Sequence, residues 1–347
     1  MIEIDGSALE GGGQIIRTAL SLSSITGKEF RVFNIRKKRA QPGLKSQHLH
    51  LLYLYKELFN CKVVGDFLYS TEVIFWPSGE LKRKQLYLDL KTAASIGLVL
   101  QGIIPVILFV FKEKITLELK GGTFGKWAIP VEFYPCCFFP LLGIKAEFSI
   151  LRRGYYPKGG GRVRLVLSSL NQNLKSINYT YAGNIKEIYI QSIASDIFRA
   201  KEGAHKQLKI ARYFLEKNLG SLPIRYEIIY CSTDSPATQI NLCAYLDSGS
   251  LVWSDCLGEK NKSPELVGKE GAQKLIKELK GGACIDKHTA DNLIPYLAML
   301  GGKIKVSEIT LHTRTNIWVC EKFLGNIFTI DETKKVIEVK KGFLNEK

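Results

Sequence analysis

The stretch IEIDGSALEGGGQIIRTALSLSSITGKEFRVFNI, residues 2–35, carries the pattern on which the fold depends. Alternating apolar residues at 2–5 and 30–35 predict two strands, and the apolar periodicity of 13–27 predicts a helix between them. A strand buries its apolar face by packing against a helix. The stretch therefore predicts a layered fold of helices on sheets.

The same order of elements returns along the chain. The first unit continues with a helix at 44–59 and a hairpin that ends near Trp76. A second unit runs from strand 85–90 to strand 162–167, and a third runs from helices at 265–280 and 289–300 to a closing hairpin. In this third unit we expect a strand at 303–311 and a helix at 316–324. Units of roughly 85 residues in the order β-α-β-α-β-β predict an α+β protein with α/β layers.

The segment 184–262 lies between the second and third units and has its own strand, long helix and two further strands. It is predicted to be a small inserted domain. Residues 1–183 and 263–347 then form the large domain.

Composition limits the function. The 347 residues include 49 Lys and Arg against 33 Asp and Glu, and the formal charge of +16 favours a polyanionic partner, although excess charge can also serve solubility alone. Eight cysteines without a CxxC pair argue against structural zinc. No signal peptide opens the chain, and its longest apolar run, 97–111, is too short to span a bilayer. We expect a cytoplasmic protein.

The stretch GGACIDKHTADNLIPYLAML, residues 281–300, places His288 at the start of an apolar helix. Free backbone N–H groups and the helix dipole favour a neutral imidazole there and attract phosphate. His288 is thus a candidate nucleophile, with Asp286 as a residue that could orient it. The alternatives are that His288 only caps the helix, or that Cys284 is the nucleophile in an apolar setting that would raise its pKa.

Three further stretches are suited to phosphate. EGGGQIIR, 10–17, puts three glycines before a helix, with a carboxylate at Glu10 and a cation at Arg17; a tight turn is the alternative. Arg39 and Lys45 flank a Pro-Gly turn and could bind phosphates; the alternative is that this segment is only a solvated basic loop. RRGYYPKGGGRVR, 152–164, combines five positive charges with two tyrosines, and its alternative is a basic hairpin.

Taken in order, five motifs resemble the RNA 3′-terminal phosphate cyclases. They are IEIDGSALEGGGQIIRTALSLS, RAQPGLKSQHL, LVLQ at 98–101, RRGYYPKGGGRV, and DKHTADNLIPYLAML followed by LHTRTNIWV. The resemblance implies a three-repeat domain related to the enolpyruvyl transferases, with a smaller insert. It also implies an ATP-dependent reaction, in which a histidine forms a covalent histidyl-AMP. The AMP passes to an RNA 3′-phosphate, and the 2′-hydroxyl displaces it to leave a 2′,3′-cyclic phosphate.

The resemblance also implies roles for individual residues. His288 matches the nucleophile, and Glu10 resembles the acid that binds a divalent metal, Mg²⁺ or Mn²⁺. The residues that resemble ATP contacts are Arg17, Arg39, Gln47, Gln101, Pro130 and Asp286. RNA phosphates are expected at Lys45, Arg152, Lys158 and Arg162, and the partners are ATP and an RNA with a 3′-phosphate end. Two alternatives are a ribosome-biogenesis paralogue that lacks the nucleophile and an enolpyruvyl transferase, which acts on small anions.

Overall fold

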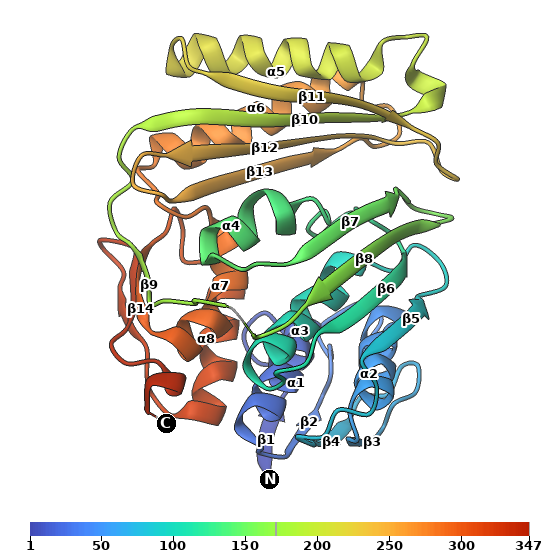
Figure 1. The fold of residues 1–347 in the computed structure, drawn as a ribbon, viewed down its shortest axis with the longest axis vertical. Helices are drawn as coiled ribbons and strands as arrows, with labels where there is room; N and C mark the ends of the chain where they lie inside the picture. Colours follow the sequence, from blue (N-terminus) through green and yellow to red (C-terminus); the bar gives the residue numbers. More distant parts are fainter. Residues whose placement is uncertain (171, 347) are drawn as a thin grey trace.

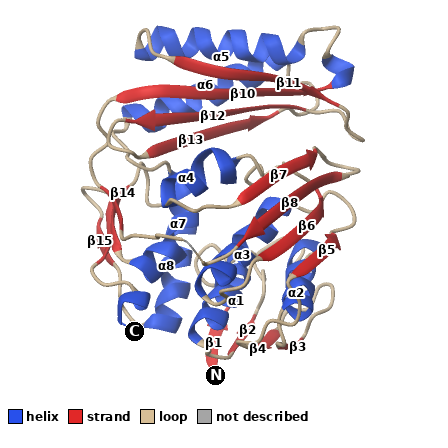
Figure 2. Cartoon of the chain, in the orientation of Figure 1, coloured by secondary structure: helices blue, strands red, loops and turns tan. Residues whose placement is uncertain are grey.

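Sheets enclose a central group of helices in the lower part of the molecule, and a further sheet with two helices lies above them (Figure 1). The computed structural model describes residues 1–170 and 172–346, and these form four four-stranded sheets. Helices and strands are both abundant (Figure 2), which confirms the α+β class expected from the sequence.

The first two units have the same strand order, β1-β2-β4-β3 and β5-β6-β8-β7, and in each the first two strands are parallel. A parallel pair needs a crossover helix, and α1 and α3 provide it. The first unit comprises β1 (Ile2–Asp5), α1 (Gln14–Thr26), β2 (Phe30–Phe33), α2 (Ser46–Leu58), β3 (Lys62–Val64) and β4 (Val73–Trp76). The second comprises β5 (Gln85–Asp89), α3 (Ile96–Phe109), β6 (Ile115–Gly121), the π-helix η1 (Tyr134–Phe138), α4 (Phe139–Leu142), β7 (Glu147–Arg152) and β8 (Gly161–Leu167).

Local chemistry sets the ends of these helices. The Ser95 hydroxyl caps α3 by accepting from the Leu98 N–H, and α1 ends at Gly27, whose φ of 74° favours glycine. Almost every residue of α1 and α3 is buried, because each helix lies between a sheet and the other helices of the central group. This burial explains why α3 is apolar around most of its circumference, whereas seven of the thirteen residues of α1 are polar.

The third unit differs from its prediction at both ends. Its first strand is β9 (Ile177–Tyr179), a three-residue strand that the sequence did not indicate. The predicted strand 303–311 is only β14 (Gly302–Lys305), and the helix expected at 316–324 begins earlier, as α8 (Leu311–Leu324). The remaining elements of the unit are α7 (Lys287–Leu300), β15 (Thr329–Asp331), β16 (Val336–Val339) and the 3₁₀ helix η3 (Phe343–Glu346).

The upper sheet has the order β11-β10-β12-β13 and carries α5 and α6 on one face. Its elements are β10 (Ile185–Ser195), the 3₁₀ helix η2 (Asp196–Phe198), α5 (Gly203–Leu219), β11 (Ile224–Cys231), β12 (Thr238–Leu246), β13 (Leu251–Leu257) and α6 (Pro264–Lys280). The assignment of helix 265–280 to the third unit is wrong, because Val267, Ala272 and Leu275 are buried in the core of this upper sheet. The upper layer follows β9 and so interrupts the third unit, where the sequence had placed it before that unit.

Within the described residues, no helix combines the length and the apolar character that a membrane crossing requires.

Candidate active site

A cavity of about 400 Å³ lies where the first turns of four helices meet. Helices α1, α3, α7 and α8 each direct their N-terminal end toward it, and β13 closes one side. The polar residues that these five elements contribute to the wall are Gln14, Arg17, Gln101, Asp255, His288, Asp291, Asn292 and His312. Helix N-termini present unpaired N–H groups and a positive dipole end, so the cavity is suited to an anion.

The glycine loop before α1 allows close packing. A Cβ atom on Gly13 would lie 1.9 Å from Nε2 of His48, and one on Gly12 would lie 2.0 Å from a carboxylate oxygen of Glu10. His48 is buried, its Nδ1 accepts from the Lys45 N–H (2.9 Å), and burial lowers its pKa to about 3. His48 is therefore a neutral core residue.

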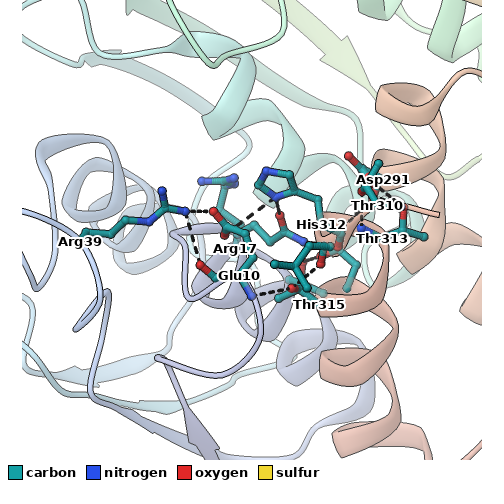
Figure 3. Close-up of polar contacts among 12 residues, drawn as sticks. Glu10, Arg17, Arg39, Asp291, Thr310, His312, Thr313 and Thr315 are labelled. Atoms are coloured by element: carbon teal, nitrogen blue, oxygen red, sulfur yellow. Dashed lines mark hydrogen bonds and ion pairs between the residues drawn. The ribbon is translucent and has the colours of Figure 1, made fainter. Parts of the chain in front are cut away.

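Glu10 is the acidic centre of the loop. Its carboxylate forms an ion pair with Arg39, and its Oε2 lies 3.9 Å from Nδ1 of His312. Figure 3 shows the Glu10 carboxylate between these two side chains. Only 12% of the Glu10 side chain is exposed, and Oε2 has no hydrogen-bond partner within the described residues. The structure thus brings the predicted Glu10 and Arg39 together.

Arg17 also lines the cavity. Its Nε donates to Oε1 of Gln101 (2.8 Å), and the Gln101 amide donates to Oδ1 of Asn292 (2.9 Å). Across residues 1–170 and 172–346, no carboxylate lies within ion-pair distance of the Arg17 guanidinium. Burial lowers the pKa of Arg17 to about 10, so the group is still charged at neutral pH. A desolvated cation without a counter-charge favours an anionic ligand.

Gln14 fixes the protonation of His312. The Gln14 amide nitrogen donates to the His312 carbonyl oxygen (2.6 Å), which leaves the amide oxygen hydrogen-bonded to Nδ1 of the imidazole. Nδ1 therefore carries the proton, and Nε2 keeps its lone pair. Burial, followed by the positive charge of Arg17, lowers the pKa of His312, so the ring is neutral at neutral pH.

His312 was not among the residues singled out from the sequence, because the helix that carries it was predicted to begin at 316. Thr310 is in fact the N-cap of α8, and its hydroxyl accepts from the Thr313 N–H (3.0 Å). Thr310 followed three residues later by Thr313 is a pattern typical of a helix start. This pattern would have moved the predicted start of the helix from 316 to 311.

His288 lies at the start of α7, as predicted, and lines the same cavity. Its imidazole makes no hydrogen bond with the described part of the chain, and the carboxylate that acts on it most strongly is Asp255. Burial lowers the pKa of His288, and Asp255 opposes this effect. Burial raises the pKa of the Asp255 carboxyl, which accepts from the Trp253 indole N–H (2.9 Å). The sequence offered no signal for Asp255, since it comes from the inserted layer.

Asp286, predicted to contact ATP or to orient His288, has both of its carboxylate oxygens occupied by hydrogen bonds within the chain. Oδ1 accepts from the backbone N–H groups of His288 (3.1 Å) and Thr289 (2.9 Å). Oδ2 accepts from the Thr289 hydroxyl (2.6 Å) and the Trp253 N–H (2.9 Å). Asp286 is a buried cap for α7. Cys284 is buried too, and burial raises its thiol pKa, which argues against a nucleophilic role.

The other predicted ATP contacts are dispersed. Gln47 lines a second, larger cavity beside the first. Pro130 is buried and lines neither cavity, whereas Ala128 and Ile129 line the first. Lys45, which was predicted to contact RNA phosphates, contacts Gln41, and its ammonium lies 4.9 Å from the ring centre of Tyr69; it lines neither cavity.

Three of the four predicted RNA contacts, Arg152, Lys158 and Arg162, lie on the β7–β8 hairpin. Arg152 pairs with Asp234 (2.7 Å), and Arg162 pairs with Glu118. Lys158 is exposed at the hairpin tip, where its backbone N–H donates to the Ser235 hydroxyl (3.1 Å). The stretch forms a basic hairpin, and its contact with RNA stays a prediction.

Asp291 should make stability depend on pH. Its Oδ1 accepts from the hydroxyls of Thr310 (2.7 Å) and Thr313 (2.6 Å), as Figure 3 shows, but burial outweighs these bonds and raises its pKa to about 7. Because the folded state favours the protonated carboxyl, its contribution to stability is fully present below the unfolded pKa near 3.8. This contribution is lost as the pH rises through 7.

As the pH rises from 4 to 8, wild type should lose on the order of 4 kcal/mol of its free energy of unfolding through Asp291. Asp291→Asn should not show this loss, so its stability relative to wild type should increase by that amount over the range. Urea unfolding of both proteins at several pH values measures this difference. Asn keeps an acceptor oxygen for the two threonines. Parallel stability curves for the two proteins would contradict the raised pKa.

Comparison with known proteins assigns the chain to a family. A sequence model described as RNA 3′-terminal phosphate cyclase matches residues 8–330. The chain is 40% identical over 334 residues to the RNA 3′-terminal phosphate cyclase of Pyrococcus abyssi and 41% identical over 334 residues to that of Pyrococcus furiosus, with 95% of both chains covered in each case. It is 39% identical over 346 residues to that of Caldivirga maquilingensis, which covers 97% of this chain and 96% of the relative. On this evidence the chain belongs to the RNA 3′-terminal phosphate cyclase family.

Proposed function

We propose that this protein uses ATP to convert an RNA 3′-terminal phosphate to a 2′,3′-cyclic phosphate, with His312 as the nucleophile. The observation that carries the proposal is the neutral His312 imidazole, fixed by Gln14 in the same cavity as the uncompensated cation of Arg17. A phosphoryl nucleophile needs a free lone pair and a positively charged surrounding for the phosphate oxygens. The family and the names of its relatives support the cyclase reaction.

The reaction has three steps. Nε2 of His312 attacks the α-phosphorus of ATP, so a P–N bond forms and the bond to pyrophosphate breaks. An oxygen of the RNA 3′-phosphate then attacks the same phosphorus and releases the histidine. Finally the RNA 2′-hydroxyl loses its proton and attacks the 3′-phosphorus, and AMP leaves.

Each side chain in the cavity has a role in this scheme. Arg17 and the helix N-termini would bind the negative phosphate oxygens, and Gln101 holds the Arg17 guanidinium in place. Gln14 holds the imidazole in the reactive tautomer through all three steps. Arg39 would reach the phosphates only by releasing Glu10 or by moving together with it.

A divalent cation is consistent with Glu10 as a single protein ligand. Oε2 of Glu10 is buried without a partner among the described residues, and such an oxygen is a ligand for Mg²⁺ or Mn²⁺. The described part of the chain has no group of three or more His, Cys, Asp and Glu that could hold a metal by itself. The other ligands would be phosphate oxygens and water. A bound cation would neutralise part of the charge on the phosphates.

The overall reaction is tested with an RNA that ends in a 3′-phosphate. With ATP and a divalent cation, we expect the terminal phosphate to become resistant to a phosphomonoesterase, because the cyclic product is a diester. AMP and pyrophosphate should be released in equal amounts to product. A terminal phosphate that stays removable under all conditions would count against the reaction. It would favour the paralogue that acts as an assembly factor.

RNA binding should weaken with salt through the β7–β8 hairpin. Each phosphate neutralised on a single strand adds about 0.7 to the negative slope of log affinity against log salt concentration. We expect Lys158→Ala to reduce that slope by up to about 0.7, and Arg152→Ala and Arg162→Ala to reduce it less, because these arginines must first leave Asp234 and Glu118. Lys340→Ala, an exposed lysine after β16, is the matched control. Equal slopes in all variants would leave the hairpin a purely structural element.

A further inference from the structure

We propose that a second cavity, next to the first, binds the last bases of the RNA strand, with Trp127 as a stacking surface. This inference rests on the proposed function and names the part of the substrate that this groove recognises. The groove has a volume of about 1060 Å³. One wall is formed by 125–128 and 155–157 of the large domain, and the other by 236–238 and 257–262 of the inserted layer.

The two cavities adjoin each other. Leu98, Lys126, Trp127, Leu257 and Lys262 line both of them. A strand that lies in the larger groove can therefore place its end in the smaller cavity, where His312 and Arg17 are found. The 3′-terminal phosphate has to reach that cavity for the proposed reaction.

Trp127 is unusual in its exposure. Its side chain is 90% exposed, and its φ of 61° is rare for a large residue. Tyr156, from the same wall of the groove, is 81% exposed. Large aromatic rings are normally buried, so two exposed rings beside one groove indicate a planar ligand.

The charges of the groove favour a polyanion. Its charged lining residues are Lys126, Lys260 and Lys262 against Glu259, and the Lys262 ammonium is paired with Glu270, which is not part of the lining (2.7 Å). Glu259 is already paired with Lys126 (3.4 Å), whose ammonium lies 5.2 Å from the ring centre of Trp127. Aromatic rings beside lysines are the pattern that binds single-stranded nucleic acid without strong sequence preference. An acidic or apolar peptide would use one of these features but not both.

The experiment measures the affinity of the full-length protein for a short labelled RNA with a 3′-phosphate, with ATP absent. Stacking of one base is worth about 1–3 kcal/mol, so Trp127→Ala should weaken binding about 5- to 150-fold. Trp127→Phe should keep most of the affinity, because it retains a ring. Tyr181→Ala, whose 73% exposed ring lines neither cavity, is the control.

A second RNA that lacks the bases nearest its 3′ end separates stacking from charge. Wild type should bind this RNA more weakly, and Trp127→Ala should add no further loss to it. Equal affinity of Trp127→Ala and wild type for the intact RNA would overturn the proposal. An equal loss for both RNAs would overturn it as well.

Uptake of labelled AMP without RNA distinguishes this proposal from the proposed function. Trp127→Ala should lower AMP uptake less than it lowers RNA affinity. A loss of AMP uptake as large as the loss of RNA affinity would assign Trp127 to ATP and overturn the groove. A wild type that takes up no AMP would instead contradict the proposed function.

Discussion

His312→Ala is expected to abolish the uptake of AMP from ATP labelled at the α-phosphate. Wild type should form a P–N bond to the protein, which acid cleaves and alkali does not. His312→Asn should fail as well, because an amide keeps polarity but offers no comparable nucleophile. The stability of either variant should change little, since the His312 side chain is half exposed. Acid-labile label on the protein, with thermal unfolding alongside, measures both effects.

His288→Ala is the matched variant, because His288 lines the same cavity and was the residue favoured by the sequence. It should still take up AMP, with a smaller loss from the changed cavity wall. The opposite pattern, in which His288→Ala takes up none and His312→Ala does, would restore the assignment made from the helix start at 281–300. Label that persists in both variants would exclude both histidines.

Arg17→Met should lower AMP uptake by about 10²- to 10³-fold, the loss typical of one electrostatic contact to a transferring group. The same change should leave the free energy of unfolding unchanged or raise it, because it removes a desolvated cation that has no carboxylate partner within residues 1–170 and 172–346. A binding residue is expected to show this opposition between activity and stability, and a structural residue is not. Initial rates of uptake and urea unfolding test the two halves separately.

Arg17→Lys is the control for charge. It keeps a cation but loses the Nε–H that donates to Gln101, so its uptake should lie between those of wild type and Arg17→Met. If Arg17→Met lost stability and activity together, Arg17 would instead support the packing of α1 and α3.

Much of the fold was predictable from local patterns. The strand at 2–5, the helix at 13–27 and the strand at 30–35 are β1, α1 and β2 within a few residues, because apolar periodicity and glycine punctuation act over short distances. The three-residue strand β9 was missed, since so short a segment has no measurable period. Helix α6 was found in the right place but assigned to the wrong core, because its apolar stripe does not specify which sheet covers it.

The sequence also predicted which stretches are suited to phosphate, since glycine loops, basic residues and helix starts are local features. Arg17, Gln101 and His288 line one cavity, and Glu10 lies 3.9 Å from the His312 imidazole that lines it too. The proposed choice of His312 over His288 does not rest on local features. The tautomer of His312 depends on Gln14, 298 positions away in the chain, and its positive surroundings come from Arg17 and Arg39. Asp286 was predicted to orient His288 because the two residues are close in sequence. The oxygens of Asp286 instead accept hydrogen bonds from backbone N–H groups of α7 and β13. The sequence by itself determined the residue types and the starts of the helices. Only the packing of four helix ends in one place decided which side chains meet. The protonation and charge of each side chain depend on neighbours that the tertiary fold brings together.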